Sequence, residues 1–131
     1  MPASKSVKLN TGAEMPTVGL GTWKSKPGEV EHAVEHALKY GYKHIDTAAA
    51  YDNETEVGKG IKMSGVPREE IFLTTKLNNP DQKNAEQALL DSLKKLDTPY
   101  IDLCKHEYLH IRKACNFKRF LVKGLCTGPL P

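Results

Sequence analysis

The stretch GYKHIDTAAAY, residues 41–51, decides the fold and carries the first candidate chemistry. Residues 44–48 have the composition of a short strand that contains the carboxylate of Asp46, and the phenol of Tyr51 follows it. A second strand is predicted at IFLTTKL, residues 71–77, which is rich in β-forming residues and carries Lys76. If the two strands are neighbours in a parallel sheet, all three side chains meet at one edge. Such a group is suited to proton chemistry on a carbonyl.

Segments with helical periodicity separate the predicted strands. Pro27 is expected at the first position of a helix whose apolar residues recur up to Leu38. Asn53 and Glu56 have the spacing of a capping box, which predicts a second helix up to about residue 63. Asp81 is expected to cap a third helix, with an apolar stripe over residues 85–96.

Two further segments complete the order of elements. Residues 7–17 contain an Asn-Thr-Gly turn and predict a small hairpin, and residues 18–23 predict a short strand interrupted by glycine. A fourth strand begins at residues 100–103. Strands that alternate with amphipathic helices imply a parallel sheet, either an open doubly wound sheet or a closed (β/α)8 barrel. Both architectures place ligands at the carboxyl ends of the strands, where Asp46 and Lys76 would lie.

Composition limits the class of protein. A chain of 131 residues, 39% of them hydrophobic and 27% charged, is long enough for one globular domain with a core. No run approaches the length of a membrane span, and the N-terminal residues lack the apolar region of a secretion signal, so a cytoplasmic setting is expected.

Charge changes abruptly after Leu103. Residues 1–103 contain 13 Lys and Arg against 15 Asp and Glu, whereas residues 104–131 contain six basic residues and one acid. All three cysteines also lie in that last segment, without a CxxC spacing for zinc. It contains no known nucleic-acid-binding module, so no nucleic-acid partner is predicted.

Two other motifs favour ordinary structural roles. GLGTWK, residues 19–24, lacks the third glycine of a dinucleotide fingerprint, and no helix opens directly on it. HAVEH, residues 32–36, has the H-x-x-E-H spacing of some zinc sites but lies opposite the apolar stripe of its helix, so a solvated face and no metal are expected.

For the Asp46, Tyr51 and Lys76 group, composition alone favours a structural salt bridge between the aspartate and the lysine. The alternative is catalytic. A free phenol has a pKa of about 10, and a neighbouring ammonium group favours phenolate and lowers that value toward the operating pH.

The sequences of these segments resemble motifs of the aldo-keto reductase family. The family's first signature is matched by residues 41–48 together with Tyr51 and residues 53–58, with Lys43 where arginine is commoner. MPTVGLGTW, residues 15–23, resembles its opening hairpin and first strand, and residues 64–77 resemble its third strand with the active-site lysine. The resemblance covers roughly residues 5–103.

This resemblance implies a (β/α)8 barrel that binds NADPH without a Rossmann fold. It implies that Tyr51 is the general acid for a carbonyl oxygen, that Lys76 lowers the pKa of that tyrosine, and that Asp46 holds Lys76. Trp23 would line the substrate pocket. Residues Gly21, Thr22 and Asp46 would lie close to the cofactor.

The family pattern breaks after strand four. The resemblance implies a His-Trp pair there, whose histidine orients the carbonyl, but Glu107 stands at the position of the histidine. His106 is one residue out of register and would face the other side of a strand. The role is therefore not assigned to it.

The expected organisation is an aldo-keto reductase-like partial barrel at residues 1–103 and a basic, disordered tail of non-family sequence at residues 104–131. A full barrel takes about 250 residues, so the chain is expected to be truncated and to have little or no activity. The family-level function is NADPH-dependent reduction of small aldehydes or ketones. The alternative is a non-catalytic fragment that serves at most as a binding partner.

Overall fold

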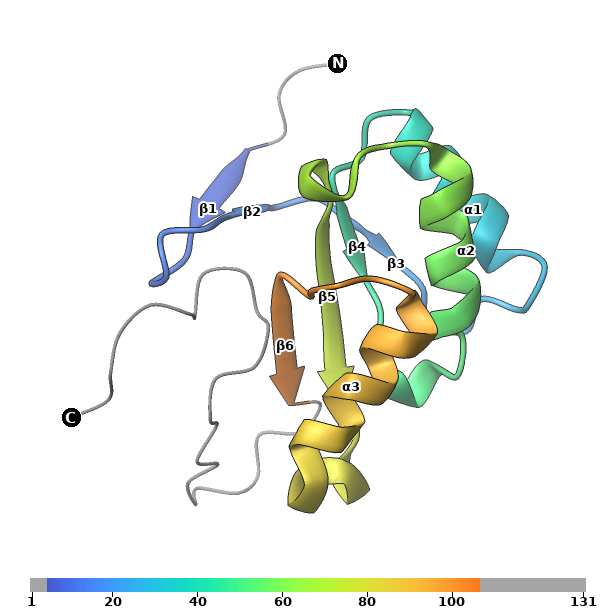
Figure 1. Cartoon of the computed structure of the whole chain (residues 1–131). Helices are drawn as coiled ribbons and strands as arrows, with labels where there is room; N and C mark the ends of the chain where they lie inside the picture. The colour runs from blue at the N-terminus through green and yellow to red at the C-terminus, as the bar shows by residue number, and fades with distance from the viewer. Residues whose placement is uncertain (1–4, 107–131) are drawn as a thin grey trace.

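A computed structural model describes residues 5–106 of the chain. A two-stranded antiparallel hairpin comes first and an alternation of parallel strands and helices follows (Figure 1). In chain order the elements are β1 (Ser6–Lys8), β2 (Glu14–Pro16), β3 (Leu20–Gly21), α1 (Val30–Lys39), β4 (His44–Asp46), η1 (Ala49–Tyr51), α2 (Glu54–Ser64), η2 (Arg68–Glu70), β5 (Phe72–Leu77), η3 (Asn79–Asn84), α3 (Ala85–Leu96) and β6 (Leu103–His106).

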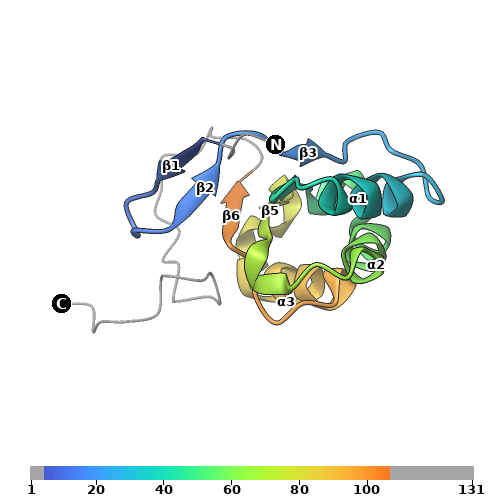
Figure 2. The same ribbon diagram turned by 90° about the horizontal axis from the view of Figure 1, so that it is seen from above.

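The four-stranded sheet runs in the order β3-β4-β5-β6, with every pair parallel. Each strand therefore lies beside the one before it, and the order never reverses. Helices α1, α2 and α3 all lie on one side of the sheet, and the hairpin lies away from them (Figure 2). A doubly wound sheet would need a reversal of strand order and helices on both faces. The described residues thus form part of a (β/α)8 barrel, as predicted.

The core lies between the sheet and the helices. It combines one face of each helix with the sheet residues that point toward them, because alternate strand residues face opposite sides. Close helix packing depends on two glycines of α2: a Cβ at Gly58 would lie 2.5 Å from the carbonyl oxygen of Leu96, and one at Gly60 would lie 2.5 Å from that of Glu31. The buried cluster comprises Val30, Val34, Leu38, Ile45, Val57, Ile61, Ile71, Leu73, Leu89, Leu96 and Ile101.

Several predicted helix starts are wrong by a few residues. Helix α1 begins at Val30, after Gly28 with φ of +86°, so Pro27 lies in a turn that this left-handed residue separates from the helix. Residues 79–84 form a 3-10 helix before α3 begins at Ala85, so Asp81 does not start the α-helix. Strand β3 is also shorter than the predicted segment 18–23.

The predicted capping box at α2 does not form. Asn53 precedes the helix, but its side chain makes no capping hydrogen bond. Its amide nitrogen instead donates to the backbone carbonyls of Thr22 at 2.9 Å and Ser25 at 3.3 Å. Asn53 is only 2% exposed, so tertiary partners have replaced the local one that the spacing indicated.

A partly buried guanidinium links the segments at the amino ends of β5 and β6. Arg68 donates to the carbonyls of Ile71 and Tyr100, to the hydroxyl of Thr98 and to the carboxylate of Asp102 at 2.8 Å. That carboxylate also accepts the backbone N–H of Leu73 at 3.0 Å. The network fixes how the chain enters its last described strand.

Candidate active site

Lys76 is the centre of the predicted site. Its ammonium group donates to the carboxylate of Asp46, to the phenol oxygen of Tyr51 at 2.9 Å and to the carbonyl of Thr47 at 3.0 Å. Strands β4 and β5 are neighbours and supply Asp46 and Lys76, while η1 carries Tyr51 over the ends of these strands. The structure thus brings together the three residues that the sequence singled out.

Burial and hydrogen bonding act on Lys76 in opposite directions. Desolvation lowers its pKa, but the hydrogen bonds and charges of Asp46 and Tyr51 outweigh that effect, so the pKa lies above its ordinary value. Lys76 therefore carries a proton and a positive charge at neutral pH. The ammonium group has donors only, so the Tyr51 oxygen accepts from it and keeps its own proton for another acceptor. This is the arrangement that a phenolic acid requires.

A hollow of about 440 Å³ lies beside this group. Trp23 stands at its rim, 67% exposed, with its ring centre 6.4 Å from that of Tyr51. The Tyr51 phenol, Lys76 and Asp46 line the hollow together with residues of β3 and the loop after it. An acceptor that enters the hollow would meet the free proton of Tyr51.

The residues predicted to approach a cofactor differ in how far they are exposed to the hollow. Gly21 lines the hollow, and a Cβ built on it meets no atom within 4 Å, so space remains open against its backbone. Thr22 also lines the hollow but is 1% exposed, and its hydroxyl donates to that of Thr47 at 2.9 Å. Its backbone N–H bonds to the carbonyl of Asp46 at 3.1 Å. Thr22 therefore supports the strand ends, and Gly21 and Asp46 face the open space.

Sequence reasoning missed His44 and Glu54. His44 lines the hollow and bonds through Nδ1 to the carbonyl of Pro16 and through Nε2 to the hydroxyl of Thr74, both at 3.0 Å. Glu54 is buried at the start of α2. Neither has a local sequence signal, because their partners lie on other elements.

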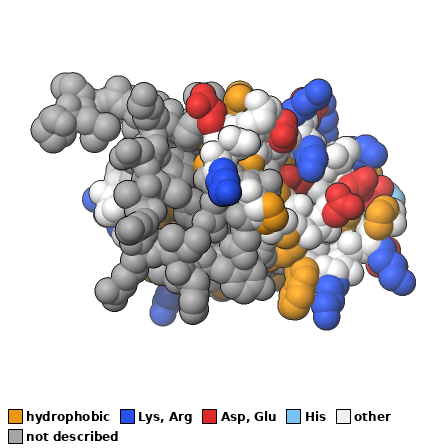
Figure 3. Space-filling model, turned by 90° about the horizontal axis from the view of Figure 1, so that it is seen from below, with side chains coloured by type: hydrophobic (Ala, Val, Ile, Leu, Met, Phe, Trp, Pro, Cys, Tyr) orange, Lys and Arg blue, Asp and Glu red, His pale blue; other side chains and the backbone are white. Residues whose placement is uncertain are grey.

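The other candidates of the sequence stay apart from this group. His32 is exposed on α1 and bonds to Glu35 at 3.4 Å, and residues 5–106 contain no cluster of three or more His, Cys, Asp or Glu side chains that would hold a metal ion. No helix of this described part is long and apolar enough to cross a membrane. Positive and negative side chains are interspersed over the described part of the face at which the strands end (Figure 3).

The register of strand β6 shows where His106 lies relative to the position of the histidine that the family pattern implies. Lys105 aligns with Lys76, and His106 aligns with Leu77, which belongs to the opposite face of the sheet. The position of His106 is therefore the out-of-register one that the sequence predicted. Glu107 and the rest of the predicted tail lie outside the described residues.

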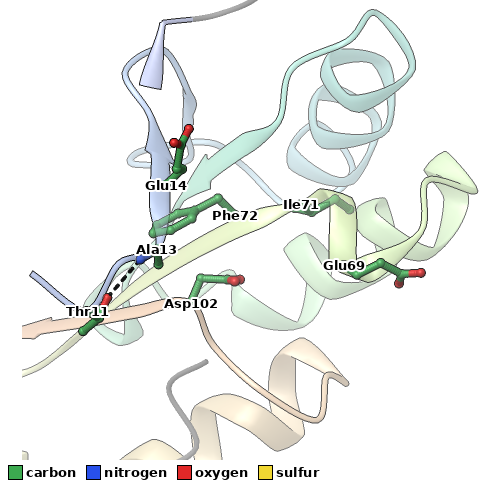
Figure 4. Close-up of a pocket in the computed structure, with 7 residues that line it drawn as sticks. All are labelled: Thr11, Ala13, Glu14, Glu69, Ile71, Phe72 and Asp102. Carbon is green, nitrogen blue, oxygen red and sulfur yellow. Dashed lines mark hydrogen bonds between the residues drawn. The ribbon is translucent and has the colours of Figure 1, made fainter. Parts of the chain in front are cut away.

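A second hollow, of about 340 Å³, lies at the other end of the sheet, between the hairpin and the start of β5. Three carboxylates border it, from Glu14, Glu69 and Asp102 (Figure 4). They point in different directions and do not converge on one point. Asp102 is already paired with Arg68, so this hollow does not compete with the Lys76 site.

Comparison with known proteins identifies relatives of this chain. A sequence profile described as the Aldo/keto reductase family matches residues 17–112. Aldehyde reductase YPR1 of Saccharomyces cerevisiae is 56% identical over 101 residues, which are 77% of this chain and 32% of the relative. Methylglyoxal reductase DkgA of Escherichia coli (strain K12) is 56% identical over 97 residues, 74% of this chain and 35% of the relative. The chain thus spans about a third of the length of these curated relatives.

Solved structures give the same result for the fold. An aldo/keto reductase of Brucella melitensis superposes with a TM-score of 0.74 at 50% identity, covering 78% of this chain and 41% of that protein. An aldo-keto reductase of Bombyx mori in complex with NADP has a TM-score of 0.71 at 42% identity, covering 77% and 37%.

Proposed function

The chain belongs to the aldo/keto reductase family, and we propose that it contributes the proton-donating part of a site that reduces aldehydes or ketones with NADPH. The observation that carries the proposal is the 2.9 Å hydrogen bond from Lys76 to the phenol oxygen of Tyr51, at the edge of an open hollow. A structural salt bridge would need only Asp46 and Lys76. The added phenol, with its proton free, favours the catalytic interpretation.

In the proposed reaction a carbonyl compound becomes an alcohol. NADPH supplies, when bound, the hydride that the carbonyl carbon receives. Tyr51 donates its phenolic proton to the carbonyl oxygen, and the charge left on the phenol oxygen is stabilised by the ammonium group of Lys76. Asp46 holds that ammonium group in place. Trp23 lines the hollow next to Tyr51 and would contact the substrate's carbon chain.

The described residues fit one part of the cofactor. Gly21 leaves its backbone uncovered toward the hollow, so the planar ring of a nicotinamide would meet no side chain there. Gly21 and Asp46 would hold this end of the cofactor, and Thr22, which is buried and already hydrogen-bonded, would support them from behind. Among the described residues that line the hollow, Lys76 supplies the one cationic side chain, and it is already bound to Asp46. The phosphate groups of NADPH would therefore be bound by other parts of a barrel.

The second candidate is a non-catalytic product of the same family, for which we propose little or no turnover by this chain alone. The observation that favours it is coverage: the chain spans about a third of its relatives, and the described sheet has four strands where a closed barrel has eight. On this proposal the acid is in place but most of the cofactor pocket is missing.

A graft separates the two candidates. Residues 17–103 would replace the matching segment of Escherichia coli methylglyoxal reductase DkgA, and NADPH oxidation with methylglyoxal would be followed. We expect an active graft, and Tyr51→Phe should lower kcat by roughly 10²- to 10⁴-fold because the proton donor is lost. Tyr42→Phe is the matched control, since Tyr42 is 40% exposed outside the site. An active graft that Tyr51→Phe leaves unchanged would refute the acid assignment.

The second experiment uses the chain itself. Without the graft, we expect no NADPH-dependent reduction of methylglyoxal and no tight cofactor binding in a fluorescence titration. Turnover that disappears with Tyr51→Phe would overturn the non-catalytic proposal and leave the acid assignment standing.

A further inference from the structure

We propose that Glu54 is a positioning residue that holds Tyr51 against Lys76 by binding strand β5 from the opposite face of the sheet. The inference rests on the proposed function, because it assigns Glu54 a role in the geometry of the proposed proton donor. It concerns a side chain that touches neither the hollow nor the reacting atoms.

Glu54 is a buried carboxyl group without a basic partner. Its residue is 2% exposed, and its two oxygens accept hydrogen bonds from the hydroxyls of Thr75 at 2.7 Å and Ser92 at 3.1 Å. No Lys or Arg among residues 5–106 forms an ion pair with it. Burial raises its pKa, although both hydroxyls and the more distant charge of Lys95 act in the opposite direction. A carboxyl group is costly in such a place, and an apolar residue would fill it more cheaply.

Thr75 and Lys76 are consecutive residues of β5 and point to opposite faces of the sheet. Thr75 is fully buried and aligns with Cys104, which packs against the core beneath the helices. Lys76 points the other way, into the hollow, where it meets Asp46 and Tyr51. One short stretch of β5 thus presents a hydroxyl on the helix side and an ammonium group on the site side.

The segment from Tyr51 to Glu54 passes over the end of β5 and binds it on both faces. Tyr51, at the end of η1, bonds to Lys76 on the site side, and Glu54, the first residue of α2, bonds to Thr75 on the helix side. Asp52 between them has a φ of +54°, which turns the chain sharply. The Glu54 bond therefore limits how far Tyr51 is able to move along or away from the strand.

The two hydroxyl partners of Glu54 make it possible to distinguish a positioning role from a purely stabilising one. Thr75 is adjacent to Lys76, whereas Ser92 belongs to α3 and is not among the residues that line the hollow. If Glu54 only joined the helices to the sheet, losing either hydroxyl would have the same kind of effect. If it positions Tyr51, losing Thr75 alone would disturb the site.

The test follows the titration of Lys76 in the whole chain by lysine ¹³Cε NMR, with the signal assigned by Lys76→Arg. Lys76 has a raised pKa partly because it bonds to Tyr51, so a displaced Tyr51 lowers it. Thr75→Val, which keeps the shape, and Glu54→Met should both lower this pKa. Glu54→Gln keeps an acceptor for Thr75 and should leave it unchanged.

Ser92→Ala is the matched control, which we expect to lower the melting temperature without changing the Lys76 titration. The proposal is overturned if Thr75→Val leaves the titration of Lys76 unchanged, or if Ser92→Ala changes it equally. Should Glu54→Met fail to fold, Thr75→Val carries the test alone.

A second readout uses the DkgA graft. There Thr75→Val should lower kcat by about 10²-fold with little change in KM, since a misplacement of about 1 Å is enough for such a loss. The NMR titration needs no turnover. An inactive graft with an intact Lys76 response would thus count against the proposed function and not against the role of Glu54.

Discussion

Replacing Asn53 by alanine tests whether the position of Trp23 depends on the start of α2. Asn53 donates to the carbonyls of Thr22 at 2.9 Å and Ser25 at 3.3 Å, one on each side of Trp23. Its side chain is buried and is a tertiary contact of the Trp23 loop, defined here as residues 22–25. Without it, that loop keeps its link to β4 but loses its link to α2.

The magnitude follows from three contributions. Two hydrogen bonds are lost, each with a net value of about 1 kcal/mol, and the longer one contributes less. The Thr22 carbonyl also accepts the backbone N–H of Ser25 at 3.2 Å, so it is not left without a donor. The Oδ1 atom of Asn53 has no hydrogen-bond partner among the described residues, so its removal returns part of a desolvation cost. The net loss is about 1 kcal/mol, or roughly 4–8 °C in melting temperature.

The chain contains a single tryptophan, so Trp23 is its own reporter. Time-resolved fluorescence anisotropy should show faster local motion of Trp23 in Asn53→Ala than in the original chain. Asn53→Asp keeps the size but turns an acceptor toward two carbonyls, so it should lower the melting temperature more than alanine does. Thr55→Ala, at an exposed position of α2, is the matched control and should change neither quantity.

Unchanged anisotropy in Asn53→Ala would refute the claim that Asn53 holds the loop. An Asn53→Asp variant as stable as the original chain would show that the two bonds do not contribute in the way described.

Three further predictions concern the helix packing, the buried histidine and the Arg68–Asp102 ion pair. Gly58→Ala should cost about 1–2 kcal/mol in urea unfolding: a Cβ 2.5 Å from the Leu96 carbonyl forces a shift of roughly 0.9 Å to reach ordinary contact, and this outweighs the gain in helix propensity of about 1 kcal/mol. His44 has a pKa lowered mainly by burial, so the unfolded chain binds its proton first and stability should decline as the pH falls below about 6.5, with an NMR midpoint for His44 below the ordinary histidine value of about 6.5. Arg68→Met should cost about 3 kcal/mol because it leaves the partly buried carboxylate of Asp102 without its cation and removes the other hydrogen bonds of the guanidinium, and a second change, Asp102→Asn, should recover part of the loss.

Exposed positions provide the comparisons for these variants. Lys59→Ala, beside Gly58 on α2, should not destabilise the chain. Lys43→Met breaks an ion pair with Glu70 whose side chains are 40% and 52% exposed, and should cost less than about 1 kcal/mol. A Gly58→Ala variant that is more stable than the original chain, a His44 midpoint at or above the ordinary histidine value of about 6.5, or equal losses for Arg68→Met and Lys43→Met would each contradict the corresponding argument.

Sequence reasoning was able to find Asp46, Tyr51 and Lys76 because strand ends are local features. The composition of residues 71–77 identifies a strand by itself, and parallel pairing then brings the ends of β4 and β5 to one edge. Helix starts were less accurate, because a proline or an aspartate near a helix has the same local pattern whether it begins the helix or precedes it.

Asn53 and Glu54 show why the tertiary roles of residues at the start of α2 were not predicted. Their hydrogen-bond partners lie between 21 and 38 residues away in the sequence, on β5, α3 and the Trp23 loop. An asparagine followed by a glutamate is equally compatible with a helix start that faces solvent. Only the tertiary packing shows that both side chains turn inward, so no spacing rule would have distinguished the two cases.

The register of β6 leads to one more test, of where the family sequence ends. Lys105 aligns with Lys76, and His106 belongs to the opposite face, so the described strand offers no imidazole to a carbonyl in the hollow. The family profile nevertheless extends to residue 112, beyond the predicted boundary at Leu103. A DkgA graft of residues 17–112 should therefore lose most of the activity of the graft that ends at residue 103, because it replaces the relative's own residues after strand four. Equal activity of the two grafts would place the boundary later and remove the need for an imidazole at this point.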